Sequence, residues 1–592
     1  MDEKPKSIWK KSLAGRTALV IWLAVAVFTV MLGCFIIAIP NFNRPSSDGV
    51  LAVGLVTGGL LAVVLFFVYV VVPLLRWLFW THWRRGLFAL ACFATLIALF
   101  YAEEDWRGWH AWNQFKHKWE AKGEHFDMAG VTPAPVPDEQ NFAMTPIAFT
   151  SYGYLLTRDG KRIPYEQRDT NFAERIKMPV AHDYNGPTNV AGNREKGKFS
   201  NLEGWQRYYR ELAAKTNEFA VPAQPQSPAA DVLLALGKYD PVIEELRAAS
   251  RLPYSRFPLQ YTNESPAAIL LPHLAALKSC AQILQLRSLA ELQNRQPDKA
   301  LDDMLLALQL TDKIRTEPFL ISHLVRIAML QITFQPVWEG LAEHRWSDAQ
   351  LVALDAELAK LDFLPDYKLS MRGEMGMQGG EVTRLRRHPE QLQSIGGNYD
   401  DEGNGSNPNL PAGLLGHLIP TGWFYQNQFR CARMMVEYYI PVADVSQGTF
   451  SPDLARHVYA VVSAETKSAT PYNLLERLML PALGASAKKF AYAQASVDLA
   501  RTAIALERYR LAHAEFPESL DALAPQFIAQ VPHDVIGGGP LKYRRTTDGQ
   551  FVLYSVGWNE TDDGGVVALT KGKPPAPDIS QGDWVWRYPQ KE

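Results

Sequence analysis

Cysteine is scarce in this 592-residue chain, which has only four. Four cysteines are too few for a disulfide-built fold. Cys34 and Cys92 lie inside long apolar runs, where a thiol behaves as a small hydrophobic group. Cys280 and Cys431 lie in the more polar part of the chain after residue 102. They would form a bridge in an oxidising compartment if their Cα atoms came within reach, and otherwise stay free thiols.

The chain also lacks a charge excess and a catalytic signature. Its 60 basic and 62 acidic residues give a formal charge of −2, so no general attraction to nucleic acid is expected. No HExxH, GxSxG, Walker or paired CxxC motif occurs. Ser486 and Lys489 form an SxxK pattern without the companion motifs of a serine–lysine enzyme. The sequence therefore predicts no catalytic site.

Long apolar runs fill the first 102 residues. Thr17 to Pro40, Val50 to Trp80 and Gly86 to Ala102 contain almost no charge, and about 20 helical residues cross a bilayer. The sequence predicts three transmembrane helices in an anchor over residues 1–102, with the lipid bilayer as partner. The third run is the shortest, and its alternative is a helix that lies in the membrane interface.

Basic residues predict the orientation of this anchor. Five precede the first run, and Arg84 and Arg85 lie between the second and the third; the five are Lys4, Lys6, Lys10, Lys11 and Arg16. Cationic residues are retained on the cytoplasmic side. We expect a protein of the bacterial inner membrane, with a cytoplasmic N-terminus and a periplasmic or extracytoplasmic body after about residue 102.

Residues 103–145 are expected to join the anchor to the body. Arg107 to Lys122 carries an aromatic stripe typical of an amphipathic helix, made of Trp109, Trp112, Phe115 and Trp119. This stripe would lie either on the membrane surface or on the body. Prolines 133, 135 and 137 predict an extended segment, which is either a stiff spacer or a strap along the body. Residues 146–225 show no sustained helical period and predict short strands and loops.

Residues 226–484 are predicted to form a helical body. Their apolar residues recur with helical spacing, and the stretch LAELQNRQPDKALDDMLLALQL is typical of a helix hairpin like those of tetratricopeptide repeats. The 34-residue repeat does not continue, so we expect an irregular helical array, an architecture that often offers a concave binding surface.

Two groups of ionisable residues lie inside predicted helices of this body. They are Glu317, His323 and Arg326, and Glu374, Glu381 and Arg384. Ion pairs or helix caps are the favoured interpretation, because an acid–base pair requires two groups with separated pKa values in one cleft.

The last predicted module covers residues 485–592. A long helix from Ser486 to His513 precedes two apolar strands, and Asp548-Gly549 between them is typical of a hairpin turn. The tail DWVWRYP is expected to pack its tryptophans on this small sheet. The predicted fold class is therefore mainly α, with a small α+β module at the C-terminal end.

This module resembles the globular head of type II secretion major pseudopilins, from about Thr502 to Trp584. The matching positions are Tyr509, Arg510, Phe516, Pro517, Leu520, Leu523, Pro532, Asp534, Pro540, Tyr543, Ser555, Gly557, Gly564 and Gly565. Asn559 stands where that family has aspartate, Val535 replaces its proline, and the module follows no processed pilin helix.

The pseudopilin resemblance implies a calcium site in the final loop, with Asn559, Asp562 and Asp563 as candidate ligands and Asp578 and Asp583 as later ones. The alternative is an acidic, solvated turn. The juxtamembrane segment, taken together with the helical body and the C-terminal module, also resembles an uncharacterised family of bacterial membrane-anchored proteins. That resemblance implies no activity.

Two functions follow as hypotheses. The first is a non-enzymatic binding or scaffold protein of the envelope, with envelope proteins as partners and a link to secretion or surface assembly. The second is an extracytoplasmic hydrolase with a site between the helical body and residues 146–225. A transporter is disfavoured, because the only charged residue in the apolar runs is Arg76, near the end of the second, and the runs offer no evident ion path.

Overall fold

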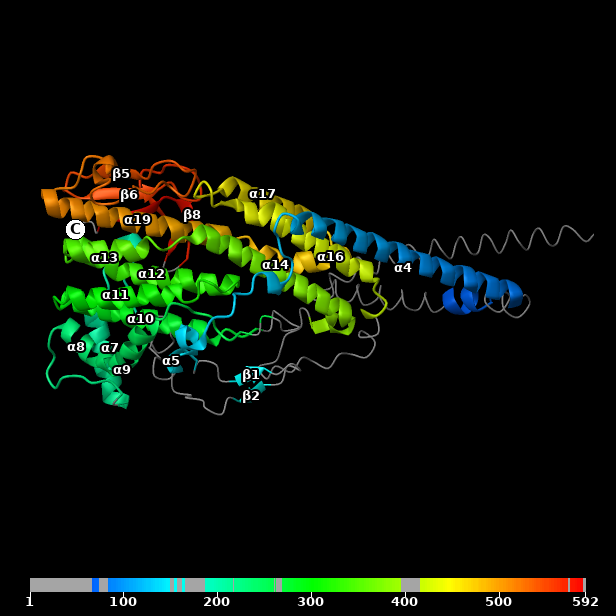
Figure 1. Cartoon of the computed structure of the whole chain (residues 1–592), viewed down its shortest axis with the longest axis horizontal. Coiled ribbons are helices and arrows are strands. Elements are labelled where there is room, and N and C mark those ends of the chain that lie inside the picture. The colour runs from blue at the N-terminus through cyan, green and yellow to red at the C-terminus, as the bar shows by residue number, and fades with distance from the viewer. Residues whose placement is uncertain are drawn as a thin grey trace, which may run out of the picture. The chain divides into compact units, whose positions relative to one another are not determined.

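The computed structural model divides the chain into two units, Met1–Glu104 and Asp105–Glu592. The residues that it describes are 66–73, 83–149, 154–156, 162–164, 187–216, 218–259, 261, 269–394, 416–572 and 575–588. They are mainly helical, with a few short strands, which confirms the predicted fold class at this level (Figure 1).

In the first unit, the described residues show one long apolar helix, not three. This helix is α4 (Trp83–Glu120), and its apolar half is almost fully exposed. The first predicted span lies outside the described residues. Only residues 66–73 of the second are described, where a short π-helix covers Phe67–Val71. By length and composition α4 is able to cross a membrane.

One other described helix passes the same test of length and composition. This is α12 (Leu320–Ala342), whose apolar stretch is 61% buried inside the second unit. Trp338, Phe334 and Leu330 of α12 are fully buried. We therefore assign α12 as a core helix of the body.

Helix α4 joins two elements that the sequence suggested separately. The third apolar run and the aromatic helix after Arg107 form one continuous 38-residue helix, because no proline interrupts the chain between them. In the second unit, Trp112 and Phe115 of α4 are buried. Their rings contact Phe126, and the ring of Phe115 also contacts Phe429. The central part of the aromatic stripe therefore packs on the body, whereas Trp109 at its start is half exposed.

The segment after α4 follows the surface of the body as a strap. Short 3₁₀ turns cover Met128–Gly130, Asp138–Gln140 and Phe142–Met144, and α5 covers Pro146–Phe149. The Nε of Arg256 donates to the Pro133 carbonyl over 3.0 Å. The Asn141 side chain both donates to and accepts from the Arg256 backbone.

Residues 146–225 contain a helix that the sequence interpretation missed. The expected strands are present as the antiparallel pair β1 (Tyr154–Leu156) and β2 (Arg162–Pro164). However, α7 (Leu202–Thr216) follows them and buries Leu202, Trp205, Tyr209 and Ala213. This apolar face packs against α8. The charged residues between these positions obscured the period.

The helical body follows the prediction closely. Its helices are α8 (Pro228–Leu236), α9 (Asp240–Ser250), α10 (Pro272–Gln293), α11 (Pro297–Asp312), α12, α13 (Asp348–Leu358), α14 (Phe363–Arg387), α16 (Thr421–Met434), α17 (Pro452–Glu465) and α18 (Leu474–Met479), and the last module begins with α19 (Ser486–His513). Ser347 begins α13 with a reciprocal capping box, and Ser451 caps α17. Helices α10 and α11 pack as the expected hairpin, where the Ser288 hydroxyl contacts the Ala300 carbonyl at 3.3 Å.

The C-terminal strands pack on the last long helix. The sheet has the order β5-β6-β9, from β5 (Lys542–Arg545), β6 (Phe551–Ser555) and β9 (Trp584–Arg587), and β7 (Val567–Leu569) pairs with β8 (Pro577–Gly582). Asp548-Gly549 forms the predicted turn between β5 and β6. The tail does not lie on the sheet as expected: it is the third strand, with Trp584 and Trp586 buried.

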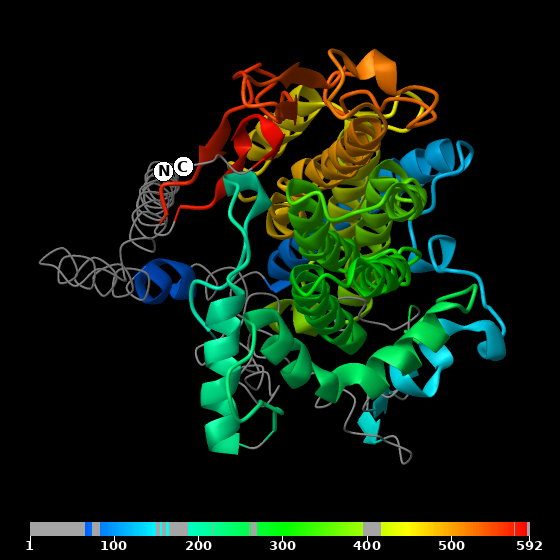
Figure 2. The ribbon, with the colours of Figure 1, turned by 90° about the vertical axis from the view of Figure 1, so that its left-hand side faces the viewer.

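Helix α19 connects this sheet with the helical body. It contacts α12, α13 and α14 as well as β6, β8 and β9, and Figure 2 shows the red C-terminal strands along one edge of the helices. Arg194, the first residue of the 3₁₀ turn Arg194–Lys196, contacts the same region. Its buried guanidinium donates to the Tyr492 hydroxyl and lies within 6.0 Å of the rings of Phe334, Tyr492 and Trp586.

Candidate functional site: a basic pocket beside α4

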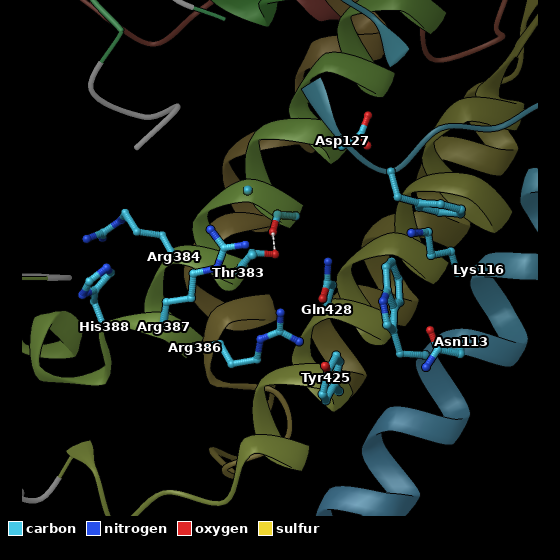
Figure 3. A pocket seen from close by; sticks show the side chains of 14 residues that line it. Asn113, Lys116, Asp127, Thr383, Arg384, Arg386, Arg387, His388, Tyr425 and Gln428 are labelled. Carbon is cyan, nitrogen blue, oxygen red and sulfur yellow. Dashed lines mark hydrogen bonds between the residues drawn. The ribbon is translucent and has the colours of Figure 1, made fainter. Parts of the chain in front are cut away.

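A pocket of about 490 Å³ lies in the second unit, where α4, α14 and α16 meet (Figure 3). Its lining is Trp112, Asn113, Lys116, Phe126, Asp127, Gly379, Gly380, Thr383, Arg384, Arg386, Arg387, His388, Tyr425 and Gln428. A volume of this size is within the range of small-molecule sites.

Positive charge dominates the pocket lining. Arg384, Arg386 and Arg387 come from the last turn of α14, and Lys116 faces them from α4. Cations at a helix C-terminus are favoured because they complement the helix dipole. Asp127 is the one carboxylate in the lining, so the described walls carry four permanent positive charges against one negative charge.

The basic side chains differ in how strongly they are already engaged. Arg384 forms a two-pronged ion pair with Glu381, so its charge is largely neutralised within α14. The Arg386 guanidinium stacks 4.5 Å from the centre of the Tyr425 ring, which orients it. Arg387 is exposed and has no ion-pair partner among the described residues. Arg386 and Arg387 therefore have the most donor capacity left for a ligand.

Lys116 and His388 are the other two nitrogen-bearing basic side chains of the lining. Lys116 lies 3.6 Å from Glu120, a contact that is weak because both groups are solvated. The His388 ring nitrogen lies 3.3 Å from Glu390.

Glycines let the pocket walls approach closely. A Cβ on Gly379 would lie 2.7 Å from the Phe126 carbonyl oxygen, and one on Gly376 would lie 3.1 Å from the backbone of Asp127. The strap can therefore cross α14 directly. Helices α4 and α16 also approach closely, along a contact that we call the seam: a Cβ on Gly108 of α4 would lie 2.2 Å from the Gly422 carbonyl oxygen of α16.

Polar contacts hold α4 and the strap in place. The Gly422 amide donates to the Asp105 carboxylate over 2.6 Å. Arg372 of α14 donates to both oxygens of Glu124 at 2.7 and 2.8 Å. This hydrogen bonding lowers the pKa of Glu124, so the pair stays ionised.

The ionisable groups predicted from sequence lie elsewhere or serve as pairs. His323 is fully buried, and its Nε2 is 2.8 Å from the Glu317 carbonyl oxygen. Burial lowers the His323 pKa to about 3, which keeps the ring neutral. His323 lines neither this pocket nor the apolar one at α18, so it gives the hydrolase hypothesis no support.

Glu317 and Arg326 are also buried structural groups. Glu317 contacts His273 Nε2 at 2.7 Å and accepts from the Ser322 hydroxyl. Arg326 pairs with Asp366, whose pKa is raised to about 6 by burial. Within this first group, Arg326 therefore has an ion-pair partner, whereas His323 is a neutral, hydrogen-bonded ring.

The second predicted group is divided by the structure. Glu381 and Arg384 form the ion pair at the basic pocket. Glu374 accepts from the Leu320 amide at 3.2 Å, and burial raises its pKa to about 7. Glu374 therefore acts as an N-terminal partner of α12.

Two further candidates receive structural roles. The Ser486 hydroxyl donates to the Leu483 carbonyl over 2.7 Å, which uses it as a local helix contact. Cys280 and Cys431 are both buried and free, so the disulfide that the sequence left open is not formed.

Asn559, Asp562 and Asp563 lie in the loop between β6 and β7, Asp578 lies in β8, and Asp583 lies between β8 and β9. The Asn559 amide donates to Asp563 at 3.0 Å, and Asp562 accepts from the Tyr554 hydroxyl at 2.8 Å. Asp583 accepts from the Gly565 and Val566 amides, and Asp578 accepts from the Ser580 amide.

These carboxylates are therefore already used by protein donors. No group of three His, Cys, Asp or Glu side chains in the described part of the chain is arranged to hold a metal ion. Calcium binding by this loop stays a prediction.

The basic pocket was missed in the sequence interpretation. The run RLRRH at 384–388 was its visible signal, but the opposite wall comes from α4, more than 260 residues earlier. Comparisons with protein families, with curated proteins and with solved structures found no match to this chain. The pseudopilin and membrane-family resemblances thus stay predictions.

Proposed function

We propose that this chain is a membrane-anchored binding protein of the bacterial envelope, whose extracytoplasmic body holds an anionic ligand in the pocket between α4, α14 and α16. The observation that carries the proposal is the convergence of Arg386, Arg387 and Lys116 on one pocket. The helix that supplies Lys116 begins as an exposed apolar helix long enough to span a bilayer.

The chemistry of the lining defines the ligand class. A guanidinium presents planar pairs of N–H donors that match carboxylate and phosphate oxygens. Arg386 is oriented by Tyr425, and Gln428 and Asn113 add neutral polar groups beside it. The ligand is therefore a small molecule or chain segment that carries phosphate or carboxylate groups.

The proposal includes the predicted anchor of three spans with a cytoplasmic N-terminus, which rests on the apolar runs and on the basic residues around them. It also includes a scaffold role among envelope proteins during secretion or surface assembly. That part rests on the pseudopilin resemblance of residues 502–584.

Anion binding is tested on the full-length protein in detergent or nanodiscs. Isothermal titration with inorganic pyrophosphate and with citrate is compared with titration of neutral glycerol. Both anions should bind and glycerol should not, and the affinity should fall as salt rises from 50 to 500 mM because the exposed charges become screened.

The decisive variant is Arg386→Gln combined with Arg387→Gln. Hydrogen bonds to charged groups contribute about 1.5–3 kcal/mol each, and about 1.4 kcal/mol is a factor of ten. We expect pyrophosphate to bind at least about tenfold more weakly. The matched control is Arg207→Gln with Arg251→Gln, two exposed arginines of the body away from the pocket. Equal affinities in both double variants, or no binding by the unaltered protein, would refute the proposal.

The orientation is tested by fusing alkaline phosphatase, which is active only outside the cytoplasm, after residue 592. The fusion should be active. An inactive alkaline phosphatase fusion, together with activity of a cytosolic reporter enzyme fused at the same position, would overturn the topology.

A further inference from the structure

A second pocket of about 340 Å³ lies at the start of α16 and beside α18. Its walls are apolar side chains from both helices and from the segment that follows α14. They include Leu392, Ile419, Trp423, Phe424, Leu474 and Leu475.

The few polar side chains in this lining are satisfied within the protein. The Asn427 amide donates to the carbonyls of Trp423 and Pro471 and accepts from the Leu475 amide, all within 2.9 Å. The Thr470 hydroxyl donates to Asn473 over 2.8 Å. The pocket thus presents apolar atoms to an occupant, and a polar ligand would lose its hydrogen bonds to water without replacement.

The start of α16 is hydrogen-bonded to a residue of α4 that closely follows the apolar part of that helix in sequence. Gly422, at the start of α16, donates to Asp105. Asp105 follows the last apolar residue, Ala102, by three residues, which is about 4.5 Å of helix. The headgroup layer on each side of a bilayer is about 5–8 Å thick. The start of α16 is therefore held at the depth of the headgroups if α4 spans the membrane.

The rim of the pocket agrees with that position. Leu418, Leu474 and Leu478 are each more than half exposed. The Trp423 ring packs against Tyr472 at 5.9 Å, and the Arg107 guanidinium lies over the Tyr472 ring. Exposed leucines beside an aromatic pair and a cation are the arrangement found where a protein surface enters a bilayer interface.

From these observations we infer that the apolar pocket between α16 and α18 takes the acyl chain of a bilayer lipid, while the rim leucines enter the boundary between headgroups and chains. The inference rests on the proposed membrane anchor. It adds a lipid contact to the body itself and is independent of anion binding in the basic pocket.

The experiment uses the full-length protein in liposomes that contain a phospholipid with a diazirine near the end of one acyl chain. After illumination and digestion, mass spectrometry identifies the labelled peptides. Label is expected on peptides from residues 86–102, which report the anchor, and on peptides that contain residues 418–427 or 469–478.

Two variants test the pocket. Leu418→Asp with Leu474→Asp places charge on the rim, and Ala469→Phe fills the pocket from an exposed lining position. Leu474 is the first residue of α18, where aspartate is compatible with a helix N-terminus. Each should lower labelling of the pocket peptides at least fivefold and leave α4 labelled. The matched control is Leu234→Asp, an exposed leucine of α8, which should label as the unaltered protein does.

The outcomes separate the two proposals. Label on α4 without label on the pocket peptides overturns the lipid site and leaves the anchor intact. Absence of label from α4 overturns the anchor. A fall in native mass from oligomer to monomer in the double variant would assign the face to a second copy of the chain, and so also overturn the lipid site.

Discussion

Replacing Gly108 with alanine should loosen the seam between α4 and α16. An added Cβ would lie 2.2 Å from the Gly422 carbonyl oxygen and 2.7 Å from the Gly422 Cα. Both atoms belong to the backbone, so no side chain can rotate to make room. The helices must separate, and the hydrogen bond from the Gly422 amide to Asp105 is lost with them.

The magnitude follows from two destabilising contributions and one stabilising contribution. Overpacking costs about 1–3 kcal/mol, and loss of a hydrogen bond to a charged group costs about 1.5–3 kcal/mol. Alanine is favoured over glycine inside a helix by about 1 kcal/mol. The net expectation is a local destabilisation of about 1.5–5 kcal/mol at the start of α16, with weaker pyrophosphate binding because Lys116 moves away from α14.

Hydrogen exchange of peptides covering residues 420–424 measures this effect. Exchange should become at least about tenfold faster in the Gly108→Ala variant, since about 1.4 kcal/mol corresponds to a factor of ten. The matched control is Gly237→Ala, because Gly237 has φ −55° and an added Cβ would meet only an Asp240 oxygen at 3.7 Å. That variant should be neutral or stabilised by about 0.4–1 kcal/mol. Unchanged exchange at residues 420–424 in Gly108→Ala would refute the close-packed seam.

Three further predictions concern the body. Arg326→Ala should lower the free energy of unfolding by about 3–5 kcal/mol in urea titrations, because it leaves the buried Asp366 unpaired; a loss below 1 kcal/mol would contradict the pair. Glu374→Gln should remove a loss of stability that occurs as pH rises from about 4.5 to about 7. The raised pKa means that the folded state holds a proton which the unfolded state releases, so the variant should gain at most about 3 kcal/mol at pH 8 and nothing at pH 4. A water-soluble maleimide should label neither Cys280 nor Cys431 until urea unfolds the body, since both thiols are buried and burial raises both pKa values; rapid labelling of the native protein would show that the body opens.

The body was largely predictable because its helices are specified locally. Apolar spacing marks α10 to α13, and Ser347 and Ser451 mark helix starts through side-chain caps that depend on the next three residues. The Asp548-Gly549 turn is local in the same way.

Two elements were not predicted. The apolar positions of α7 recur with helical spacing, but the charged residues between them obscured the period. The last strand was interpreted as a packed tail, because its pairing partner β6 lies about 30 residues earlier and nothing within the tail specifies that register.

The amino-acid sequence by itself determined the apolar N-terminal stretch, the mainly helical body, the caps and the final hairpin, since these depend on composition and on neighbours within a few residues. Tertiary structure decided which charges meet. It paired Arg326 with Asp366 and brought Lys116 of α4 opposite Arg386 and Arg387 of α14. Such sites depend on the close approach of backbones at Gly108 and Gly379, and a distance between segments hundreds of residues apart is a property of the packed fold.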